Sequence, residues 1–381
     1  MKIQNLQSFA AFSVIGTVTL MPLLVLPAMV GVLVDNAAMS ESSAGFSASA
    51  NFLASAIVGL ILSVRMHHIN LRQISTIVFS IAIFTDVASA YTAGNSMTFF
   101  AARIGSGLML GVAYAACVAA FARVDGYERG FGLFVTIQFI ISGIGLYVVP
   151  VYADVLGAKG LFLLFAAGDA LALMLTRHLP SEIVATHKQE KGLSEFAVLL
   201  KYSALLAIVG FAIFEAANNA QFAFIERFGV ALELSDHDIG VSLLVASLIG
   251  IPGAFCIVLA GNRFGTLQPL MFGISIGIVG MVVLINATTY PWYFFGSCCM
   301  GFSWAFCLPF IQSLLAAIDR RGSAIAAGSS FATLGSAAGP GIAAIIVVGG
   351  RYSSVFLFSI ALFVVTIALF LLAEKMRKQS K

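Results

Sequence analysis

Charged side chains are scarce in this sequence. Of its 381 residues only 10% are Asp, Glu, Lys or Arg and 60% are hydrophobic, whereas roughly 25% of a soluble domain is charged. A soluble fold has no place for so much apolar surface, because the excess would form large patches in contact with water. The composition therefore excludes an ordinary soluble protein and predicts a membrane protein whose surface is largely solvated by lipid.

Residues that carry redox, metal or hydrolytic chemistry are also few. The five cysteines lie in apolar runs, where thiols behave as small hydrophobic groups. The five histidines form no His, Asp, Ser or Cys constellation typical of a lipid-processing enzyme, although His237 stands between Asp236 and Asp238, and His67-His68 has no further metal ligand nearby. No glycine-rich phosphate-binding loop occurs, which argues against an ATP-driven pump. We expect no enzyme activity, no cofactor and no metal site.

Long apolar runs are abundant, and there are twelve of them. About 20 residues suffice to cross a bilayer as a helix. The first run is too long for a secretory signal and lacks a cleavage site, so we interpret it as the first span. The expected spans are 9–34, 46–64, 73–93, 98–121, 131–152, 160–176, 202–225, 238–260, 267–287, 291–317, 323–348 and 353–373.

Lysine and arginine are distributed unevenly between the connections. One side of the membrane carries 16 of them, and the other carries three, Lys159, Arg227 and Arg351. By the positive-inside rule both termini lie in the cytoplasm. We expect a multi-pass protein of the cytoplasmic (inner) membrane.

The two halves of the chain repeat each other. Arg129 and Arg321, in the charged loops after spans 4 and 10, are 192 positions apart, and Pro150 and Pro340 are 190 apart. A parallel duplication of six helices explains this offset. We expect a six-helix bundle at 1–176, a cytoplasmic linker at 177–201 and a second bundle at 202–381.

Short motifs give these halves a family likeness. Arg103, Gly107 and Gly111 form an Arg-xxx-Gly-xxx-Gly pattern in span 4, and Glu128-Arg129-Gly130 follows it. Gly335-xxx-Gly339-Pro340 occurs in span 11. With these motifs and twelve spans the chain resembles the major facilitator superfamily over nearly its whole length. It departs from the family in the loop between spans 2 and 3, which lacks the usual acidic residue, and in span 5, which lacks the antiporter motif.

The resemblance implies an all-α fold of two six-helix bundles related by a pseudo-twofold axis. It also implies secondary transport by alternating access, with an aqueous cavity between the bundles. Glycines of span 11 are expected to serve helix packing more than ligand contact. Residues of the loops after spans 2 and 8 are expected to switch conformation: Arg65, Arg72, Asn262, Arg263 and Gly265.

Span 7 has a polar face. Glu215, Asn218, Asn219 and Glu226 lie within about 60° of one line at 100° per residue. This face lines either the cavity or an interhelical hydrogen-bond seam. We favour the cavity, and Glu215 is the best candidate for a protonation site, because an isolated carboxylate in apolar surroundings readily takes up a proton. Arg227 points about 100° away from Glu226, so we do not expect these two residues to pair, and we interpret them as a solvated helix end.

Span 4 places Arg103 and Tyr114 on one face. From the rise per residue Asp86 of span 3 reaches a similar depth, so we hypothesise an Asp86–Arg103 ion pair that acts either as a structural clamp or as a coupling element. Asp169 in span 6 is expected to be structural.

The predicted function is transport of a small organic solute coupled to protons, with uptake and efflux both open. The scarcity of charge argues against polyanionic solutes and leaves weakly polar, amphipathic or monoanionic ones, with Arg103 as a candidate counter-charge. A membrane enzyme acting on lipid and a channel are the alternatives. We expect lipid but no nucleic acid as a partner, and a monomer. Further candidates for lining a cavity are Gln138, Tyr147, Trp304, Gln312 and Glu226.

Overall fold

The structure is a computed structural model that describes residues 3–63, 66–94, 97–124, 127–182, 201–260, 265–319, 323–347 and 349–379. Over these ranges the chain is helical, and no strand is present. Twelve helical segments are long and apolar enough to cross a membrane, which confirms the predicted number. The chain divides into two compact units, Met1–His187 and Lys188–Lys381.

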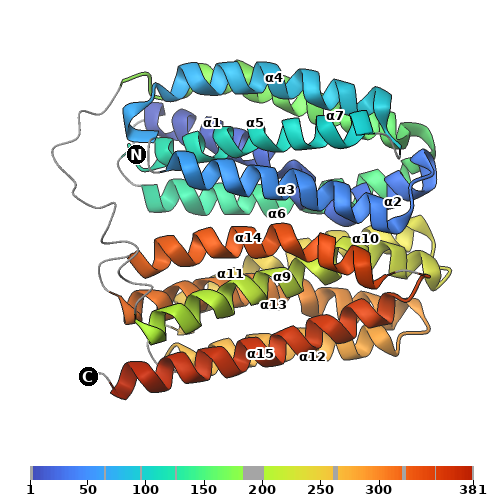
Figure 1. Ribbon diagram of the computed structural model, residues 1–381, viewed down its shortest axis with the longest axis vertical. Coiled ribbons are helices and arrows are strands. Elements are labelled where there is room, and N and C mark those ends of the chain that lie inside the picture. The colour runs from blue at the N-terminus through green and yellow to red at the C-terminus, as the bar shows by residue number, and fades with distance from the viewer. Residues whose placement is uncertain are drawn as a thin grey trace. The chain divides into compact units, whose positions relative to one another are not determined.

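The first unit holds six of the spans (Figure 1). Its α-helices are α1 (Ile3–Leu24), α2 (Leu26–Ala37), α3 (Glu41–Ser63), α4 (Leu71–Thr92), α5 (Met97–Phe121), α6 (Tyr127–Val151) and α7 (Ala153–Leu175). Short 3₁₀ turns follow α3 and α7, at Met66–His68 and Thr176–His178. An aromatic cluster fills the core, with Phe121 edge-on to Phe12 at 5.4 Å and tilted against Phe134 at 5.6 Å between ring centroids.

The first span differs from the uninterrupted helix predicted over 9–34. It is broken at Val25, which has φ −114° and ψ 22° and separates α1 from α2. Pro22 lies inside α1, and Pro27 lies in the first turn of α2. Because proline lacks an amide hydrogen and its ring clashes with the preceding turn, two prolines so close together interrupt the helix.

The second unit holds the other six spans (Figure 1). Its helices are α9 (Tyr202–Ala231), α10 (Asp236–Leu248), α11 (Gly250–Ala260), α12 (Leu267–Ile285), α13 (Tyr290–Ile318), α14 (Ser323–Ile346) and α15 (Tyr352–Gln379). Helices α10 and α11 together make the eighth span. Phe214 stacks on Phe363 at 5.4 Å, and Phe228 packs edge-on against Phe356 at 5.1 Å, so these rings bind α9 to α15.

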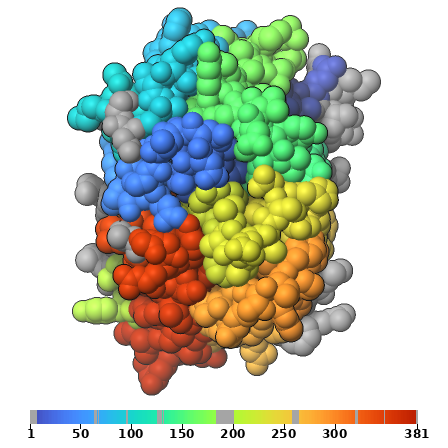
Figure 2. Space-filling model, turned by 90° about the vertical axis from the view of Figure 1, so that its right-hand side faces the viewer, coloured from blue at the N-terminus to red at the C-terminus, as the bar shows by residue number. Residues whose placement is uncertain are grey.

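The same helix pairings occur within both units. In the first unit α5 packs on α3 and α4, α4 on α7, and α1 on α6 and α7. In the second unit α13 packs on α10, α11 and α12, α12 on α15, and α9 on α14 and α15. Each pairing of the first unit thus has its counterpart at the equivalent spans of the second. Figure 2 draws the side chains of both units as space-filling spheres, coloured along the chain.

Arginines fasten the segment after α7 to the first unit. Arg72 donates from Nε to the carbonyl oxygen of Leu179 at 3.2 Å. Arg123 donates from Nη1 to the carbonyl oxygen of Glu182 and from Nη2 to that of Met66, both at 2.9 Å. Partial burial lowers the pKa of Arg123, a shift that leaves so strong a base cationic at neutral pH. The start of the expected linker therefore packs on the first unit.

Several predicted loop residues lie outside the described part of the chain. They are Arg65, Asn262, Arg263, Arg321 and most of the linker. Gly265 is described, and its φ of 61° is a left-handed conformation that glycine adopts without strain.

Candidate functional site

Glu215 lies on α9 and receives hydrogen bonds from three side chains. Trp304 of α13 donates its indole N–H to Oε1 at 3.2 Å. Ser336 of α14 donates to Oε2 at 2.9 Å, and Asn219, one turn along α9, donates to the same oxygen at 3.3 Å. The carboxyl group of Glu215 thus joins three helices of the second unit.

All three of these donors are neutral. Among the residues that the structure describes, no lysine, arginine or histidine contacts Glu215. Its side chain is buried. The ionised carboxylate therefore carries an uncompensated negative charge, and one proton makes the group neutral. This property distinguishes Glu215 from Asp86, Glu226 and Glu374, each of which pairs with an arginine.

Glycines of α14 bring Ser336 within reach of Glu215. A Cβ atom on Gly335 would collide with the carbonyl oxygen of Ala212, and one on Gly339 would lie 2.6 Å from that of Ala216. Because glycine lacks this atom, α14 approaches the backbone of α9 closely on both sides of Ser336. These glycines have the packing role expected from the sequence.

The other polar side chains on this face of α9 form hydrogen bonds mainly with atoms of α9 itself. Asn218 donates to the carbonyl oxygen of Phe214 at 2.8 Å and accepts from Gln221 at 3.3 Å. Gln221 is buried, and its Oε1 has no hydrogen-bond partner. The predicted grouping of Glu215 and Asn219 is present as a direct contact, and Gln221 belongs to the same polar set although the sequence analysis did not select it.

The prediction for Glu226 and Arg227 was wrong. Their side chains form a two-pronged ion pair, with Nε to Oε2 at 2.7 Å and Nη2 to Oε1 at 2.8 Å, and both residues are buried. The helix continues to Ala231, so the pair is not at a helix end. Neighbouring Cβ atoms diverge by about 100°, but long flexible side chains can turn toward each other beyond Cβ.

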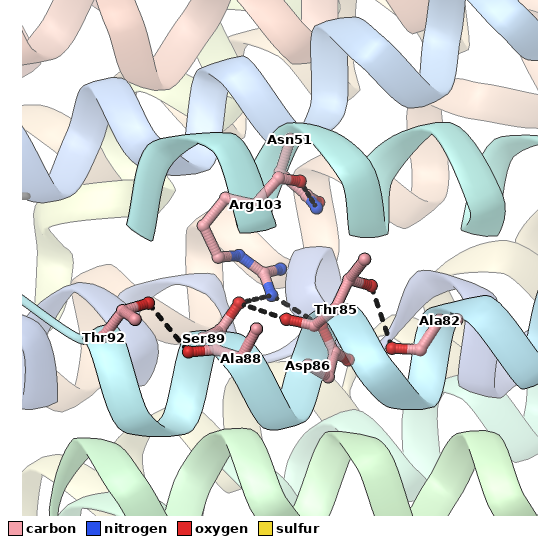
Figure 3. Close-up of polar contacts among 8 residues, drawn as sticks. All are labelled: Asn51, Ala82, Thr85, Asp86, Ala88, Ser89, Thr92 and Arg103. Atoms are coloured by element: carbon pink, nitrogen blue, oxygen red, sulfur yellow. Dashed lines mark hydrogen bonds and ion pairs between the residues drawn. The ribbon is translucent and has the colours of Figure 1, made fainter. Parts of the chain in front are cut away.

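The hypothesised ion pair between spans 3 and 4 is present. Arg103 Nη1 of α5 lies 2.8 Å from Oδ1 of Asp86 on α4, and it also reaches Ser89 Oγ at 3.5 Å (Figure 3). Asn51 of α3 donates to the backbone carbonyl oxygen of Arg103 at 2.8 Å. The guanidinium also lies over the ring of Phe162 on α7, 4.9 Å from its centroid.

Arg103 is therefore part of the interior of the first unit. Only 1% of its side chain is exposed, and its charge is balanced by Asp86. Gly107 packs against α3, where a Cβ atom would collide with the carbonyl oxygen of Asn51. Tyr114, further along α5, is half-buried against the core and has no described contact with Arg103. These positions do not bring Arg103 and Tyr114 together as a solute-binding pair.

The other predicted lining residues are scattered. Gln138 and Tyr147 are half-buried on α6, and Gln312 is exposed on α13. Trp304 joins the cluster around Glu215 through its indole N–H. Within the described ranges no group of three or more His, Cys, Asp or Glu side chains is arranged to hold a metal ion.

Sequence reasoning missed two kinds of contributor. Ser336 lies 121 positions from Glu215 and is one of many serines, so no local pattern marks it. Asp169, expected to be structural, is 2% exposed and interacts electrostatically with Asp86 and Arg103. The signal that could have found Asp169 is its depth, since an acidic residue inside a span requires a partner.

Comparison with known proteins agrees with this architecture. A crystal structure of a mutant of the nucleoside transporter NupG superposes with a TM-score of 0.78, covering 96% of this chain and 99% of that one at 13% identity. None of the curated proteins compared with the sequence matches it. Residues 7–319 match the family described as Major Facilitator Superfamily. Taken with the twelve spans and the repeated helix pairings, this match shows that the chain belongs to the major facilitator superfamily of transporters.

Proposed function

We propose that this protein moves a small organic solute across the cytoplasmic membrane by alternating access, and that protons drive the movement through Glu215. Membership in the family supports secondary transport. The observation that carries the coupling is the position of Glu215, which is buried among three neutral donors and has no cationic partner among the described residues.

A buried carboxyl group without a cationic partner becomes neutral when it binds a proton, whereas one paired with an arginine is already balanced when it is ionised. Binding of one proton changes the net charge at Glu215 from −1 to zero, and no cation among the described residues contacts the group to offset this change. Charge within a bilayer is unfavourable by about 2.5–3.5 kcal/mol on insertion scales. Ionisation is therefore favoured only in a conformation that hydrates the group or supplies a cation, and this preference links the proton to the conformational cycle.

The nearby groups point to a solute recognised by hydrogen bonds and by an aromatic surface. Trp304 offers an indole ring beside Glu215, and Asn218, Asn219 and Gln221 offer amides on the same stretch of α9. Arg103 is occupied by Asp86, so it is not available as a counter-charge for an anion. These features favour an uncharged or weakly polar solute over a polyanion. Nucleosides have this character, and the NupG likeness makes them a reasonable first set to test.

The test is solute flux in proteoliposomes with an imposed pH gradient. A labelled panel of nucleosides and other small polar or amphipathic compounds is presented to the wild type, Glu215→Gln and Glu374→Gln. Glu374 is a suitable control because it pairs with Arg377 at 2.6 Å near the end of α15, away from Glu215.

The wild type and Glu374→Gln should accumulate or expel a solute in response to the gradient, and the direction of flux distinguishes symport from antiport. Glu215→Gln should lose the response to the gradient while it still exchanges solute at equilibrium. The coupling role is refuted if Glu215→Gln responds to the gradient as the wild type does. Folded wild-type protein that moves none of the panel would count against the proposed class of solute.

A further inference from the structure

The first unit contains a second group of buried charges, separate from Glu215. Arg103 on α5 pairs with Asp86 on α4 at 2.8 Å, and its guanidinium lies over the ring of Phe162 on α7. Asp169 lies two turns after Phe162 on the same face of α7 and interacts with both charges, and each of the three charged residues is at most 2% exposed. Ser89 contacts the arginine at 3.5 Å, and Ser106 lies against Asp86. We call Asp86, Arg103 and Asp169 the buried triad.

The charges of this triad do not balance if every group is ionised. Two carboxylates and one guanidinium give a net charge of −1 in the interior of a helix bundle. A buried charge without compensation is strongly unfavourable, and proteins avoid it by pairing or by neutralisation. One arginine can balance only one of the two acids.

Several polar atoms of the triad and its neighbours also have no hydrogen-bond partner within the described chain. Within the described chain seven buried side-chain polar atoms have no hydrogen-bond partner, and four of them belong to this neighbourhood: Asp86 Oδ2, Arg103 Nη2, Ser106 Oγ and Asp169 Oδ2. Two of the four are carboxyl oxygens of adjacent acids. Ionised carboxyl oxygens are acceptors only, so two adjacent carboxylates cannot bond to each other, whereas a hydrogen held on one acid can be donated to the other.

Among the described residues of α1 to α5 and α7, no other charged side chain lies at the depth of the triad. The remaining ionisable residues of α4 and α7 are Arg72, Tyr91, Asp154 and Lys159, all within the terminal turns or next to the break at Gly157. Helix α1 carries no charged residue, and α2 and α3 carry only Asp35 and Glu41, near helix ends. On α5 the other ionisable groups are Tyr114 and Cys117, about three and four turns from Arg103.

We propose that the buried triad is a proton-binding site in which Asp86 and Asp169 share one proton beside Arg103. The proton makes the triad neutral and lets one acid donate a hydrogen bond to the other. It also joins α4 to α7, while Arg103 joins α4 to α5. This site is independent of Glu215, and the chain therefore binds two separate protons inside the membrane.

Infrared spectroscopy of purified protein tests this site directly, because a protonated carboxyl group absorbs apart from a carboxylate and its band shifts in heavy water. The measurements use the Glu215→Gln background, so that Glu215 cannot contribute. At neutral pH this protein should still show a buried protonated carboxyl band. If the band is missing, the proposal is refuted without any substitution in the triad.

Single substitutions then assign the band. In the same background, Asp86→Asn or Asp169→Asn leaves one acid opposite Arg103, so each triad is neutral without a proton and the band should disappear. Asp154→Asn, an exposed acid in the first turn of α7, is the matched control and should retain the band. A band that survives both triad substitutions would overturn the assignment.

Thermal unfolding provides a second readout. At alkaline pH the shared proton is lost and the triad becomes negative, so the folded state releases a proton that the unfolded chain has already lost. The Tm of the Glu215→Gln protein should therefore fall from neutral to alkaline pH, and the Tm of the Asp169→Asn derivative should fall less. A Tm that depends on sodium in place of pH would identify a metal ion site and reject the proton.

Discussion

The close approach of α9 and α14 leads to a prediction that can be tested by adding one carbon atom. In Gly335→Ala the new Cβ would overlap the carbonyl oxygen of Ala212, an atom that belongs to helix backbone and cannot rotate away. Overpacking of this kind costs about 1–3 kcal/mol. Helix propensity opposes it, because alanine is favoured over glycine by about 1 kcal/mol inside a helix.

A matched control removes the propensity contribution. Gly132 on α6 is also helical, and a Cβ atom there would have no heavy atom within 4 Å. Gly132→Ala should therefore be neutral or slightly stabilising. The difference between the two variants isolates the steric effect, which we expect to be about 1–3 kcal/mol, or about 2–4 °C in Tm for each kcal/mol.

The assay is thermal unfolding of each variant in detergent, followed by gradient-driven flux. Moving α14 away from α9 should weaken the contact between Ser336 and Glu215, so Gly335→Ala should also transport poorly. Ser336→Ala should then have a smaller additional effect in the Gly335→Ala background than in the wild type. A Gly335→Ala protein as stable as Gly132→Ala would refute the close packing on which the geometry of Glu215 depends.

Two further outcomes follow from the second unit. Glu226→Gln removes the carboxylate that accepts two hydrogen bonds from the buried guanidinium of Arg227 and should destabilise the protein, while Glu226→Gln combined with Arg227→Gln should be less destabilised. Equal losses in thermal unfolding would contradict a direct pair. Trp304→Phe keeps an aromatic ring but removes one donor to the carboxylate of Glu215, so the pH dependence of flux should move toward alkaline pH. An unchanged pH profile would show that the indole N–H does not support the ionised form.

Some contacts were accessible from the sequence and others were not, for geometric reasons. The Asp86–Arg103 pair was predictable because neighbouring spans run antiparallel and the rise per residue fixes the depth of each side chain. The contact between Glu226 and Arg227 was not, since the angle between Cβ atoms does not describe where long side chains end. The neighbours of Asp169 could not be predicted, because they depend on which helix face α7 presents to α4.

The amino-acid order alone was enough to predict the membrane environment, the number of spans, the duplication and the family resemblance. These properties follow from hydrophobic length, charge distribution and spacing along one chain, all of which are local or periodic. The packing of the helices was needed to show which neutral donors surround Glu215 and that two acids share one arginine. Those contacts depend on helix rotation and on approach distances set by glycines such as Gly335, and neither quantity is encoded in the spacing of any single helix.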